Sequence, residues 1–483
     1  MGKRGVTRPM EMLPNMEPDK KPEMLRMHHK QTQWVYWAVM LLGCWMILAP
    51  FTFGYDVGVV APSGGRSVWL SLSVRIAAMM WSDIVSGALL VLFGWRSLTP
   101  GRAVSGWIIC GIGIWLSAAP LIFWAPTAVC YMNDTMVGAW LIALSILIPG
   151  MPNMVLHMKM GAETPPGWSY NPSSWAQRWI LIALGFVGWL VSRYLAAFQL
   201  GYITSVWDPF FGDSTRQVLN SSMSHGVPIS DAGLGSLAYT FEFLMGFMGT
   251  QARWRTMPWM VTLFGILVIP LGLVHIFLVI SQPIIVGHWC TFCLLAAAIM
   301  LPMIPLEFDE VLAMLQFVRR SVRRGESFWK TFWMGGADSP EQKGGEDERS
   351  PNPVKMAEGP IQILRASIWG FSVPYSLLFS AVLGLWLVFA PAVFDVSRPV
   401  ANFTHAAGLL AVTFSVIAMG EVIRMFRWVN IVLALALIAV PIWASSPALF
   451  TAHHLLAGIL LIVLSVPKGR IFEKYGTWQR MIR

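Results

Sequence analysis

The sequence is poor in cysteine and in charged residues. Only five cysteines occur in 483 residues, which excludes a fold held together by many disulfides. Charged residues make up 12% of the chain, too few to cover the surface of a soluble protein. The net charge of +9 does not indicate nucleic-acid binding, because the basic residues lie mainly between apolar segments. A cleavable signal is not expected either, since about thirty polar residues precede the first apolar run.

Apolar sequence is abundant: hydrophobic residues make up 56% of the chain. Windows of about 20 residues with few charges recur, and a helix of that length crosses a bilayer. We therefore predict an all-α integral membrane protein with about twelve transmembrane helices. The predicted spans are 34–54, 76–95, 104–124, 135–151, 179–200, 234–251, 258–281, 289–306, 372–394, 402–420, 428–445 and 453–467.

Basic residues predict the orientation of these spans. With twelve spans, the loops that hold most of the arginines, such as 319–324, fall on one side together with both termini. The positive-inside rule places that side in the cytoplasm. The 202–233 loop and the start of the 289–306 span then lie at the outer face. We expect the cell (inner) membrane of a bacterium, with lipid as a partner.

Two polar linkers, about 157–178 and 320–368, divide the spans into three groups of four. The run 335–360 is rich in Pro, Gly and mixed charge, so we expect disorder there. The predicted segments are a flexible cytoplasmic tail 1–31, a four-helix block 32–156, a central domain 165–320, a cytoplasmic linker 321–368, a second four-helix block 369–470 and a basic tail 471–483.

The two outer blocks share an internal repeat. The segment Gly43–Pro50 recurs at 113–120 and 384–391, with a weaker copy at 434–441. In each partner helix a polar residue precedes a glycine by four positions, and a small residue lets helices pack closely. These polar residues are Asp83, Asp134, Thr404 and His454.

The repeat resembles the SPW-repeat membrane domain, although Ala-Pro or Val-Pro replaces Ser-Pro at each copy. The resemblance implies packing and anchoring. Ionisable residues inside a membrane are rare, however, so catalysis or transport remains the alternative for them. They are Asp83, Asp134, His405, His453 and His454.

Cys290 and Cys293 begin one of the apolar runs. If the run is helical, the two sulfurs lie on one face at the N-terminal end, where free backbone N–H groups favour a thiolate. Such a pair suits two-electron dithiol chemistry. A zinc site with His288 would have three ligands of the four that structural zinc needs, and no histidine follows Cys293 to form a covalent haem motif. We therefore expect no metal.

Several motifs surround this pair. The central domain begins with Pro165-Pro166-Gly167-Trp168, its long outer loop holds Val206-Trp207-Asp208-Pro209-Phe210, and its fourth span begins with Trp289-Cys290-Thr291-Phe292-Cys293. This arrangement of four helices, over 165–320, resembles the vitamin K epoxide reductase family. The resemblance implies a quinone of the ubiquinone or menaquinone type at the outer face. It implies that Cys293 faces the quinone, and that Cys290 exchanges disulfides with a soluble thioredoxin-like protein outside the cytoplasm. A cysteine at a helix start is also expected to be the more exposed and acidic of the two.

The chain departs from this family in one respect. Family members commonly carry a second cysteine pair in the first outer loop, which relays electrons, whereas 202–233 contains no cysteine. Either a soluble dithiol protein meets Cys290 directly, or the path is shortened, or turnover is lost. Cys130 is a candidate replacement, although a single thiol at a span end is more often a buried small hydrophobe.

Further polar and aromatic residues are candidates for the site. Asp231 is either the N-cap of its helix or a hydrogen-bond donor or acceptor for the quinone, and His288 either assists the thiols or is an interfacial histidine. Trp207 and Phe292 complete the predicted quinone-binding set. Arg193 and Glu242 are predicted to form a buried pair. His275 is expected to face the bundle core.

Three functions remain open. The first is a membrane thiol–disulfide oxidoreductase that exchanges electrons between Cys290/Cys293 and a membrane quinone. The second is a redox-silent quinone-binding or scaffold protein, suggested by the missing loop cysteines. A transporter ranks last, because broken helices with convergent charges are not evident.

Overall fold

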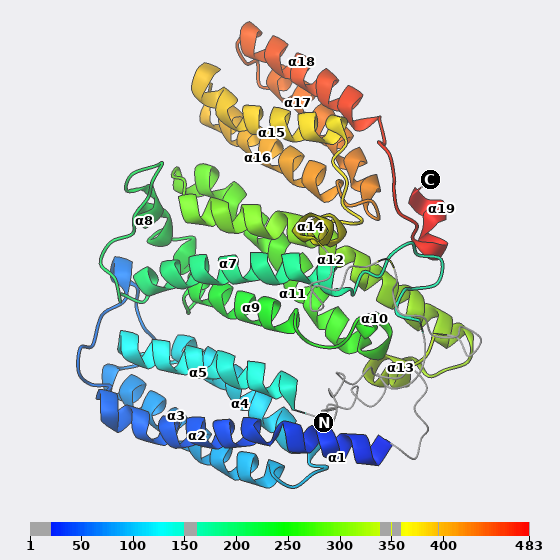
Figure 1. Cartoon of the computed structure of the whole chain (residues 1–483). Helices are drawn as coiled ribbons and strands as arrows, with labels where there is room; N and C mark the ends of the chain where they lie inside the picture. Colours follow the sequence, from blue (N-terminus) through cyan, green and yellow to red (C-terminus); the bar gives the residue numbers. More distant parts are fainter. Residues whose placement is uncertain (1–20, 149–161, 339–348, 350–358, 395, 483) are drawn as a thin grey trace, which may run out of the picture.

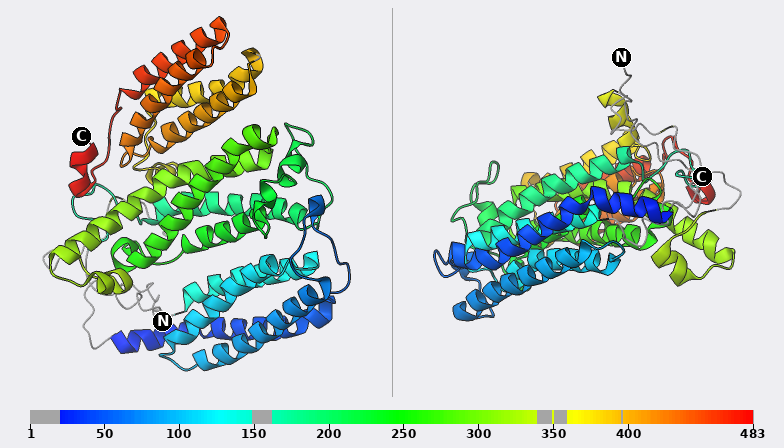
Figure 2. Two further views of the ribbon diagram at one scale, coloured as in Figure 1. Left: turned by 180° about the vertical axis from the view of Figure 1, so that it is seen from behind. Right: turned by 60° about the horizontal axis from the view of Figure 1, so that its bottom comes forward.

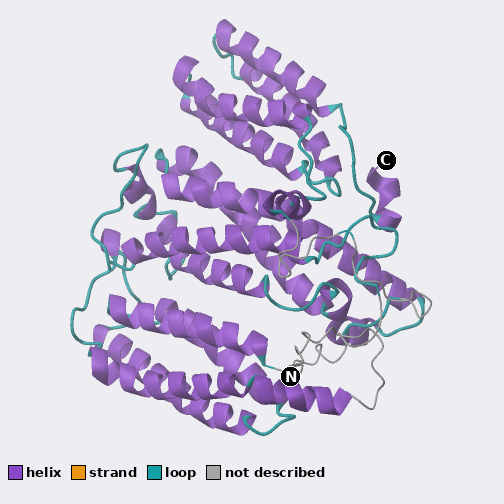
Figure 3. Cartoon of the chain, viewed as in Figure 1, coloured by secondary structure: helices purple, strands orange, loops and turns teal. Residues whose placement is uncertain are grey.

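The computed structural model describes residues 21–148, 162–338, 349, 359–394 and 396–482. Regular structure in these residues is entirely helical (Figure 3), which confirms the predicted fold class. In the described part of the chain, eleven helices are long and apolar enough to cross a membrane, and the chain is an integral membrane protein. The sixth predicted span, 234–251, is not among these helices. It corresponds to α9 (Asp231–Met245), whose 15 residues extend only about 22 Å.

The long helices form three tiers (Figure 1, and from behind in Figure 2). The N-terminal block contains α2 (Gln33–Phe53), α3 (Leu72–Ser97), α4 (Ala103–Ile122) and α5 (Ala128–Leu147). The central bundle contains α7 (Trp175–Gln199), α9, α11 (Pro258–Ser281) and α12 (Thr291–Arg323). The C-terminal block contains α15 (Tyr375–Phe394), α16 (Arg398–Ile417), α17 (Val429–Trp443) and α18 (Ala448–Ser465).

Short helices mark the two ends of the tiers. They are α1 (Lys21–Gln31), α8 (Ser214–Leu219), α10 (Arg253–Thr256), α13 (Phe328–Met334), α14 (Pro360–Ser367) and α19 (Gln479–Ile482). We call the end that carries α8 and the 200–230 loop the α8 end, and the opposite end, with α10, α13 and the C-terminal helix, the α19 end (Figure 1).

Each outer block consists of two helical hairpins, and the two helices of each hairpin cross at small residues. A Cβ on Gly43 would lie 2.8 Å from the carbonyl oxygen of Gly87, too close for any side chain. Gly113 and Gly138 in the second hairpin and Gly384 and Gly408 in the third meet in the same way. In the fourth hairpin, a Cβ on Gly458 would lie 2.9 Å from the carbonyl oxygen of Ala434. The repeated glycines therefore fix where the hairpin helices cross.

The polar residues of the repeat meet inside their blocks. Asp83 and Asp134 are fully buried and close enough to interact electrostatically. Tyr55 donates to Asp83, and the Asn133 amide donates to Asp134 at 3.2 Å. At the corresponding place in the C-terminal block, Thr404 Oγ1 lies 3.1 Å from His454 Nε2. The same repeat positions thus carry two aspartates in one block and a threonine and a histidine in the other.

The blocks pack directly on the central bundle. Helices α4 and α5 contact α9, and α16 contacts α11 and α12. The main hydrophobic core belongs to the central bundle and includes Tyr475 and Ile482 of the C-terminal segment. That segment is held at the α19 end, where Tyr475 Oη donates to Glu421 at 3.0 Å.

Several predicted boundaries are wrong. Helix α5 begins at Ala128 rather than at 135. Thr127 is its N-cap, and the Thr127 Oγ1 accepts a hydrogen bond from the Cys130 N–H. Helix α12 continues to Arg323, 17 residues past the predicted end, because Asp309 and Glu310, which follow Pro305, are buried and have partners. The predicted tail 1–31 ends in helix α1; residues 1–20 lie outside the described residues.

The predicted linker contains helices α13 and α14. Of the expected disordered run 335–360, residues 339–348 and 350–358 lie outside the described residues. Asp338, in contrast, is buried and accepts hydrogen bonds from Arg320 Nε at 2.9 Å and Nη2 at 2.6 Å.

Candidate functional site

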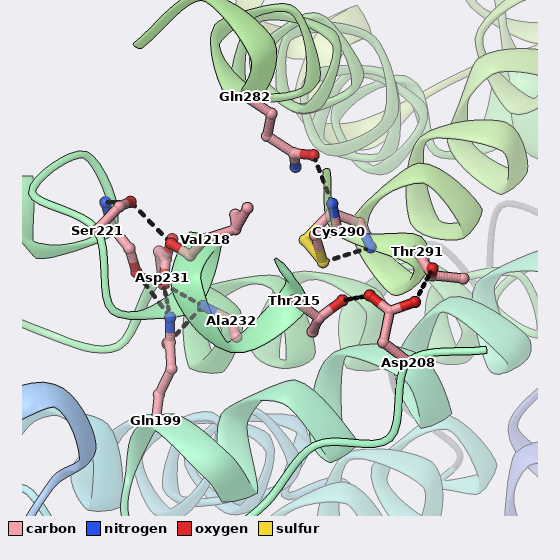
Figure 4. The surroundings of a disulfide bond; sticks show 12 residues. Gln199, Asp208, Thr215, Val218, Ser221, Asp231, Ala232, Gln282, Cys290 and Thr291 are labelled. Atoms are coloured by element: carbon pink, nitrogen blue, oxygen red, sulfur yellow. Dashed lines mark hydrogen bonds between the residues drawn. A yellow bond between two sulfur atoms is a disulfide. The ribbon is translucent and has the colours of Figure 1, made fainter. Parts of the chain in front are cut away.

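The head of α12 is shaped by the turn that precedes it. Helix α11 ends in a single π-helical turn, Gln282–Val286, and Gly287 then adopts a φ of 76°, which glycine tolerates best. This reversal places the Gln282 side chain against the start of α12, where its Oε1 accepts the Cys290 N–H at 3.0 Å (Figure 4). The turn thus supplies a partner for a backbone group that a helix start leaves free.

Cys290 and Cys293 form a disulfide in this structure, with their Cα atoms 5.2 Å apart. Cys290 is the N-cap of α12, and its sulfur accepts the Cys293 N–H at 3.1 Å. The pair therefore lies at a helix N-terminus, as the sequence predicts, where the backbone favours negative charge on sulfur.

The exposure of the two sulfurs is the reverse of the expectation. Cys290 is completely buried, whereas Cys293 is partly exposed and borders an apolar cluster. On the side of Cys290, Gln282 of the π-helical turn lies against the start of the helix and accepts a hydrogen bond from its backbone.

Asp208 ties the 200–230 loop to the cysteine helix. Its Oδ1 accepts the Thr291 hydroxyl at 2.5 Å, and its Oδ2 accepts the Thr215 hydroxyl at 2.5 Å (Figure 4). The same carboxylate accepts the backbone N–H groups of Phe210 and Phe211. Burial opposes the charged form, but these hydrogen bonds outweigh it and lower the pKa of Asp208 below its ordinary value. Asp208 is therefore a charged residue that links the loop, α8 and α12.

Aromatic and aliphatic side chains surround Cys293. The rings of Phe292 and Tyr194 are 5.1 Å apart, and those of Phe292 and Trp207 are 6.4 Å apart. Tyr194 Oη accepts the backbone N–H of Trp207 at 2.8 Å. The buried members of the cluster are Val191, Leu195, Phe198, Leu219 and Ala296. Two predicted site residues, Phe292 and Trp207, thus lie together, and Phe292 packs in the same cluster as Cys293.

His288 and Asp231 have separate hydrogen-bond partners. His288 Nδ1 is 3.5 Å from Ser214 Oγ at the start of α8. Asp231 is in the first turn of α9, but the N-cap is Ser230, whose side chain accepts the Gly233 N–H. The Asp231 carboxylate instead accepts the Gln199 amide at 2.5 Å and the Ser224 hydroxyl at 3.0 Å. The N-cap interpretation of Asp231 is therefore wrong.

The central bundle thus combines four helices, a long loop after the first and a cysteine pair at the head of the fourth. Residues 179–308 match the sequence model of the vitamin K epoxide reductase family. The match covers the disulfide, the 200–230 loop and the cluster around Cys293, so the resemblance to this family is confirmed over these residues. No curated protein and no solved structure matches the chain. The likeness of the outer blocks to SPW-repeat domains stays a prediction.

The predicted pair of Arg193 and Glu242 does not form. Arg193 points toward the N-terminal block, where its guanidinium donates to Thr135 Oγ1 at 2.9 Å and lies 4.9 Å from the Trp189 ring. Glu242 is fully buried on α9. Helical depth alone suggested the pair, but the two side chains leave their helices in different directions.

Two other candidates have structural surroundings. Cys130 is fully buried in a cluster with Tyr55 and Tyr131, which favours the small hydrophobe over a replacement for the loop cysteines. His275 Nδ1 lies 3.3 Å from the Leu271 carbonyl oxygen, and its ring is 5.8 Å from that of Tyr239, so it faces α9. Within the described residues, no group of three or more His, Cys, Asp or Glu side chains is placed to hold a metal ion.

Sequence reasoning missed Asp208, Thr291 and Gln282. A signal for Asp208 was present, because Asp-Pro-x-x-Gly is typical of a turn whose carboxylate caps its own backbone. The hydrogen bond from Thr291 to this carboxylate spans 83 positions, and no local pattern indicates it.

Proposed function

We propose that this protein is a membrane thiol–disulfide oxidoreductase that exchanges electrons between Cys290/Cys293 and a membrane quinone. The observation that carries the proposal is the disulfide at the head of α12, inside the segment that matches the vitamin K epoxide reductase family. The α8 end faces the outside of the cell in this proposal, and both termini face the cytoplasm.

The proposed reaction balances without a metal. When the dithiol is oxidised, the two S–H bonds break, one S–S bond forms, and two electrons and two protons pass to the quinone to give a quinol. In the reverse direction a quinol reduces the disulfide. The N-terminal position on α12 supports the thiolate that either direction needs, because the backbone N–H of Cys293 points at the Cys290 sulfur.

The surroundings of Cys293 fit an apolar ring. The cluster around it offers aliphatic side chains and the ring edges of Phe292 and Tyr194, and such a lining with few polar groups is typical of small-molecule sites. His288 and Asp231 are the polar groups that we assign to the quinone oxygens. Cys293 is the sulfur nearest this cluster, so we assign it to the quinone and Cys290 to exchange.

Exchange at Cys290 requires opening of the turn that covers it. Since Cys290 is buried, a thioredoxin-like partner gains access only when the Gln282 contact to the helix start is released. The partner then exchanges disulfides with Cys290 directly, without the relay that loop cysteines would provide.

The test is turnover of purified protein with a quinone and a dithiol protein in detergent, followed by quinol absorbance. We expect Cys290→Ser and Cys293→Ser to lose at least about 1,000-fold in rate, because a nucleophile and its partner act as a unit. Cys44→Ser and Cys110→Ser change free cysteines outside the matched segment and are the matched controls. Unchanged turnover in the two site variants would rule out the mechanism.

A redox-silent quinone-binding protein is the second candidate. The burial of Cys290 and the absence of cysteine from 202–233 favour it. Thiol trapping in cells separates the two: a cysteine pair whose redox state ignores the state of the quinone pool supports the silent protein, and a pair that follows the pool supports the oxidoreductase.

A further inference from the structure

Two loops of the N-terminal block reach the 200–230 loop at the α8 end. The first, residues 54–71, joins α2 to α3, and the second, residues 123–127, joins α4 to α5. Both lie outside the segment that matches the vitamin K epoxide reductase family. We call these two loops the clamp.

Arg66 makes the principal polar contact of the clamp. Its Nη2 donates to the carbonyl oxygen of Ser224 at 2.7 Å and to the Ser224 hydroxyl at 3.1 Å. Its Nη1 donates to the carbonyl oxygen of Ile229 at 3.0 Å. One guanidinium therefore holds two points of the loop, five residues apart, and a rigid fork of donors suits this task.

The contact continues from Ser224 to the candidate site. The Ser224 hydroxyl donates to Asp231 Oδ1 at 3.0 Å, and the Gln199 amide donates to both Ser224 Oγ and Asp231 Oδ1. The Gln199 Oε1 accepts the Ser230 hydroxyl at 2.6 Å. Arg66 is thus one hydrogen-bonded residue away from Asp231, whose carboxylate the proposed function assigns to the quinone.

Trp124 forms the second part of the clamp. It is 1% exposed, and its Nε1 donates to the carbonyl oxygen of Pro228 at 3.1 Å. Its φ of 52° lies in the left-handed region, which is costly for a bulky residue and persists only where the surroundings hold it. The Arg66 guanidinium lies 5.6 Å from the Trp124 ring, so the two residues support each other.

Three further contacts fasten the beginning and middle of the loop. Tyr202 Oη donates to the Ala125 carbonyl oxygen at 2.8 Å, and Ser63 Oγ donates to Asn220 at 3.2 Å. At Gly201, with a φ of 85°, a Cβ would lie 2.0 Å from the carbonyl oxygen of Ala61. Only glycine allows this approach, so the clamp backbone packs directly on the loop.

We propose that the N-terminal block fixes the 200–230 loop in place, and that Arg66 is a positioning residue for Asp231; the second part rests on the proposed function. A loop that relays electrons has to move between a partner and the helix pair. This loop carries no cysteine and is fastened to the N-terminal block near both of its ends, at 201–202 and over 220–229. The clamp therefore holds the loop as a fixed wall of the site. A soluble dithiol partner then meets the Cys290/Cys293 pair without a relay through this loop.

The first test is hydrogen–deuterium exchange of loop peptides in the full-length protein. Arg66→Gln keeps an N–H donor but removes the charge and the forked guanidinium. Hydrogen exchange of the backbone amides over 221–231 is expected to accelerate about tenfold or more, because hydrogen bonds from a charged group are lost. Arg216→Gln is the matched control, because Arg216 is an exposed arginine of the same loop, paired with Asp213 at 3.2 Å. Equal exchange in the two variants would overturn the clamp.

The second variant guards against misfolding. Trp124→Phe removes the hydrogen bond to Pro228 while keeping an aromatic ring, and faster exchange confined to the same peptides is expected. Exchange can be measured in the Cys290→Ser/Cys293→Ser background, so this arm decides the clamp even if the protein has no oxidoreductase activity.

The third measurement concerns positioning. Arg66→Gln is expected to raise the quinone KM at least about fivefold with kcat within about twofold, the signature of lost binding, and Arg66→Lys is expected to restore part of it. A lower kcat at unchanged KM would show only a smaller folded fraction and would overturn the positioning role. Absence of turnover in the parent protein would overturn the proposed function and, with it, the positioning role, while leaving the exchange result to decide the clamp.

Discussion

At the α19 end of the central bundle, a buried ion pair joins two helices, whereas at the α8 end the charged side chains are either exposed or bonded to neutral groups. Arg253 and Glu310 meet at 2.5 Å with 0% and 2% of their side chains exposed. At the other end, the Arg216–Asp213 pair is 55% and 59% exposed, and Asp208 is held by hydroxyl and backbone N–H groups.

This difference indicates that the α19 end anchors the bundle, whereas the α8 end holds the candidate site. A buried pair that loses one partner leaves an uncompensated charge, so the α19 end resists local opening. Hydrogen bonds between loops break at lower cost, which suits an end where Cys290 must be uncovered for exchange. The variants below compare the two ends, from the largest expected effect to the smallest.

Glu310→Gln is expected to have the largest effect. It leaves the Arg253 guanidinium buried without its carboxylate, which costs about 3–5 kcal/mol of stability, and it also alters the acceptor of the Ser173 hydroxyl. Thermal unfolding in detergent checks this result. The matched control is Glu326→Gln, whose carboxylate is 44% exposed in its pair with Arg324; we expect a change within about 0.5 kcal/mol. Equal melting temperatures for the two variants would erase the contrast between the ends.

Asp208→Asn is expected to act locally. The amide loses the charge that the two threonine hydroxyls bond, at a cost of about 1–2 kcal/mol, which accelerates hydrogen exchange over 206–219 without a comparable loss of global stability. Because the pKa of Asp208 is lowered in the folded protein, its contribution is present above the ordinary value near 3.9 and is lost only in stronger acid. The loop attachment should therefore not titrate between about pH 5 and 8.

Asp213→Asn is the control for this variant, because Asp213 is an exposed carboxylate on the same loop. A drop in melting temperature for Asp208→Asn as large as that of Glu310→Gln would show that the α8 end is as tightly anchored as the other end.

His225 is expected to give the smallest effect. Burial first, and then the neighbouring Arg66, lower the pKa of His225, while Asp231 acts in the opposite direction. The stability that this histidine contributes is therefore present above its ordinary value near 6.5 and is lost as pH falls through the lower folded value. We expect the melting temperature of the parent, relative to that of His225→Gln, to be higher at pH 7.5 than at pH 5, by on the order of 1 °C. A histidine that stabilises the protein more at pH 5 would reverse the assigned sign.

The helices of the molecule were largely predictable, but their ends were not. The span that begins near Cys290 was expected to stop at 306, since Glu307, Asp309 and Glu310 follow. The helix continues because Tyr170 donates to Asp309 and Arg253 pairs with Glu310. These partners come from other elements, and sequence periodicity carries no information about them.

The candidate site was predictable in its chemistry and not in its geometry. The cysteine pair, Phe292 and Trp207 do lie together at the helix head. The order of exposure of the two cysteines was wrong: Cys290 is buried, and Gln282, eight residues upstream in the π-helical turn, bonds to its backbone. The pairing of Arg193 with Glu242 failed for a related reason: depth along a helix does not specify the direction in which a side chain leaves it.

The sequence by itself determined the membrane class, the central group of helices, the glycine crossings of the hairpins and the cysteine pair at a helix start. These features depend on composition and short-range spacing, which the bilayer and the helix repeat convert directly into structure. Only the tertiary structure decided which sulfur is covered, where Asp208 and Asp231 find their partners, and that the N-terminal block reaches the loop through Arg66. The contacts of Arg66 join residues up to 163 positions apart, and the energies of all these contacts come from desolvation and hydrogen-bond geometry that exist only once the chain has folded.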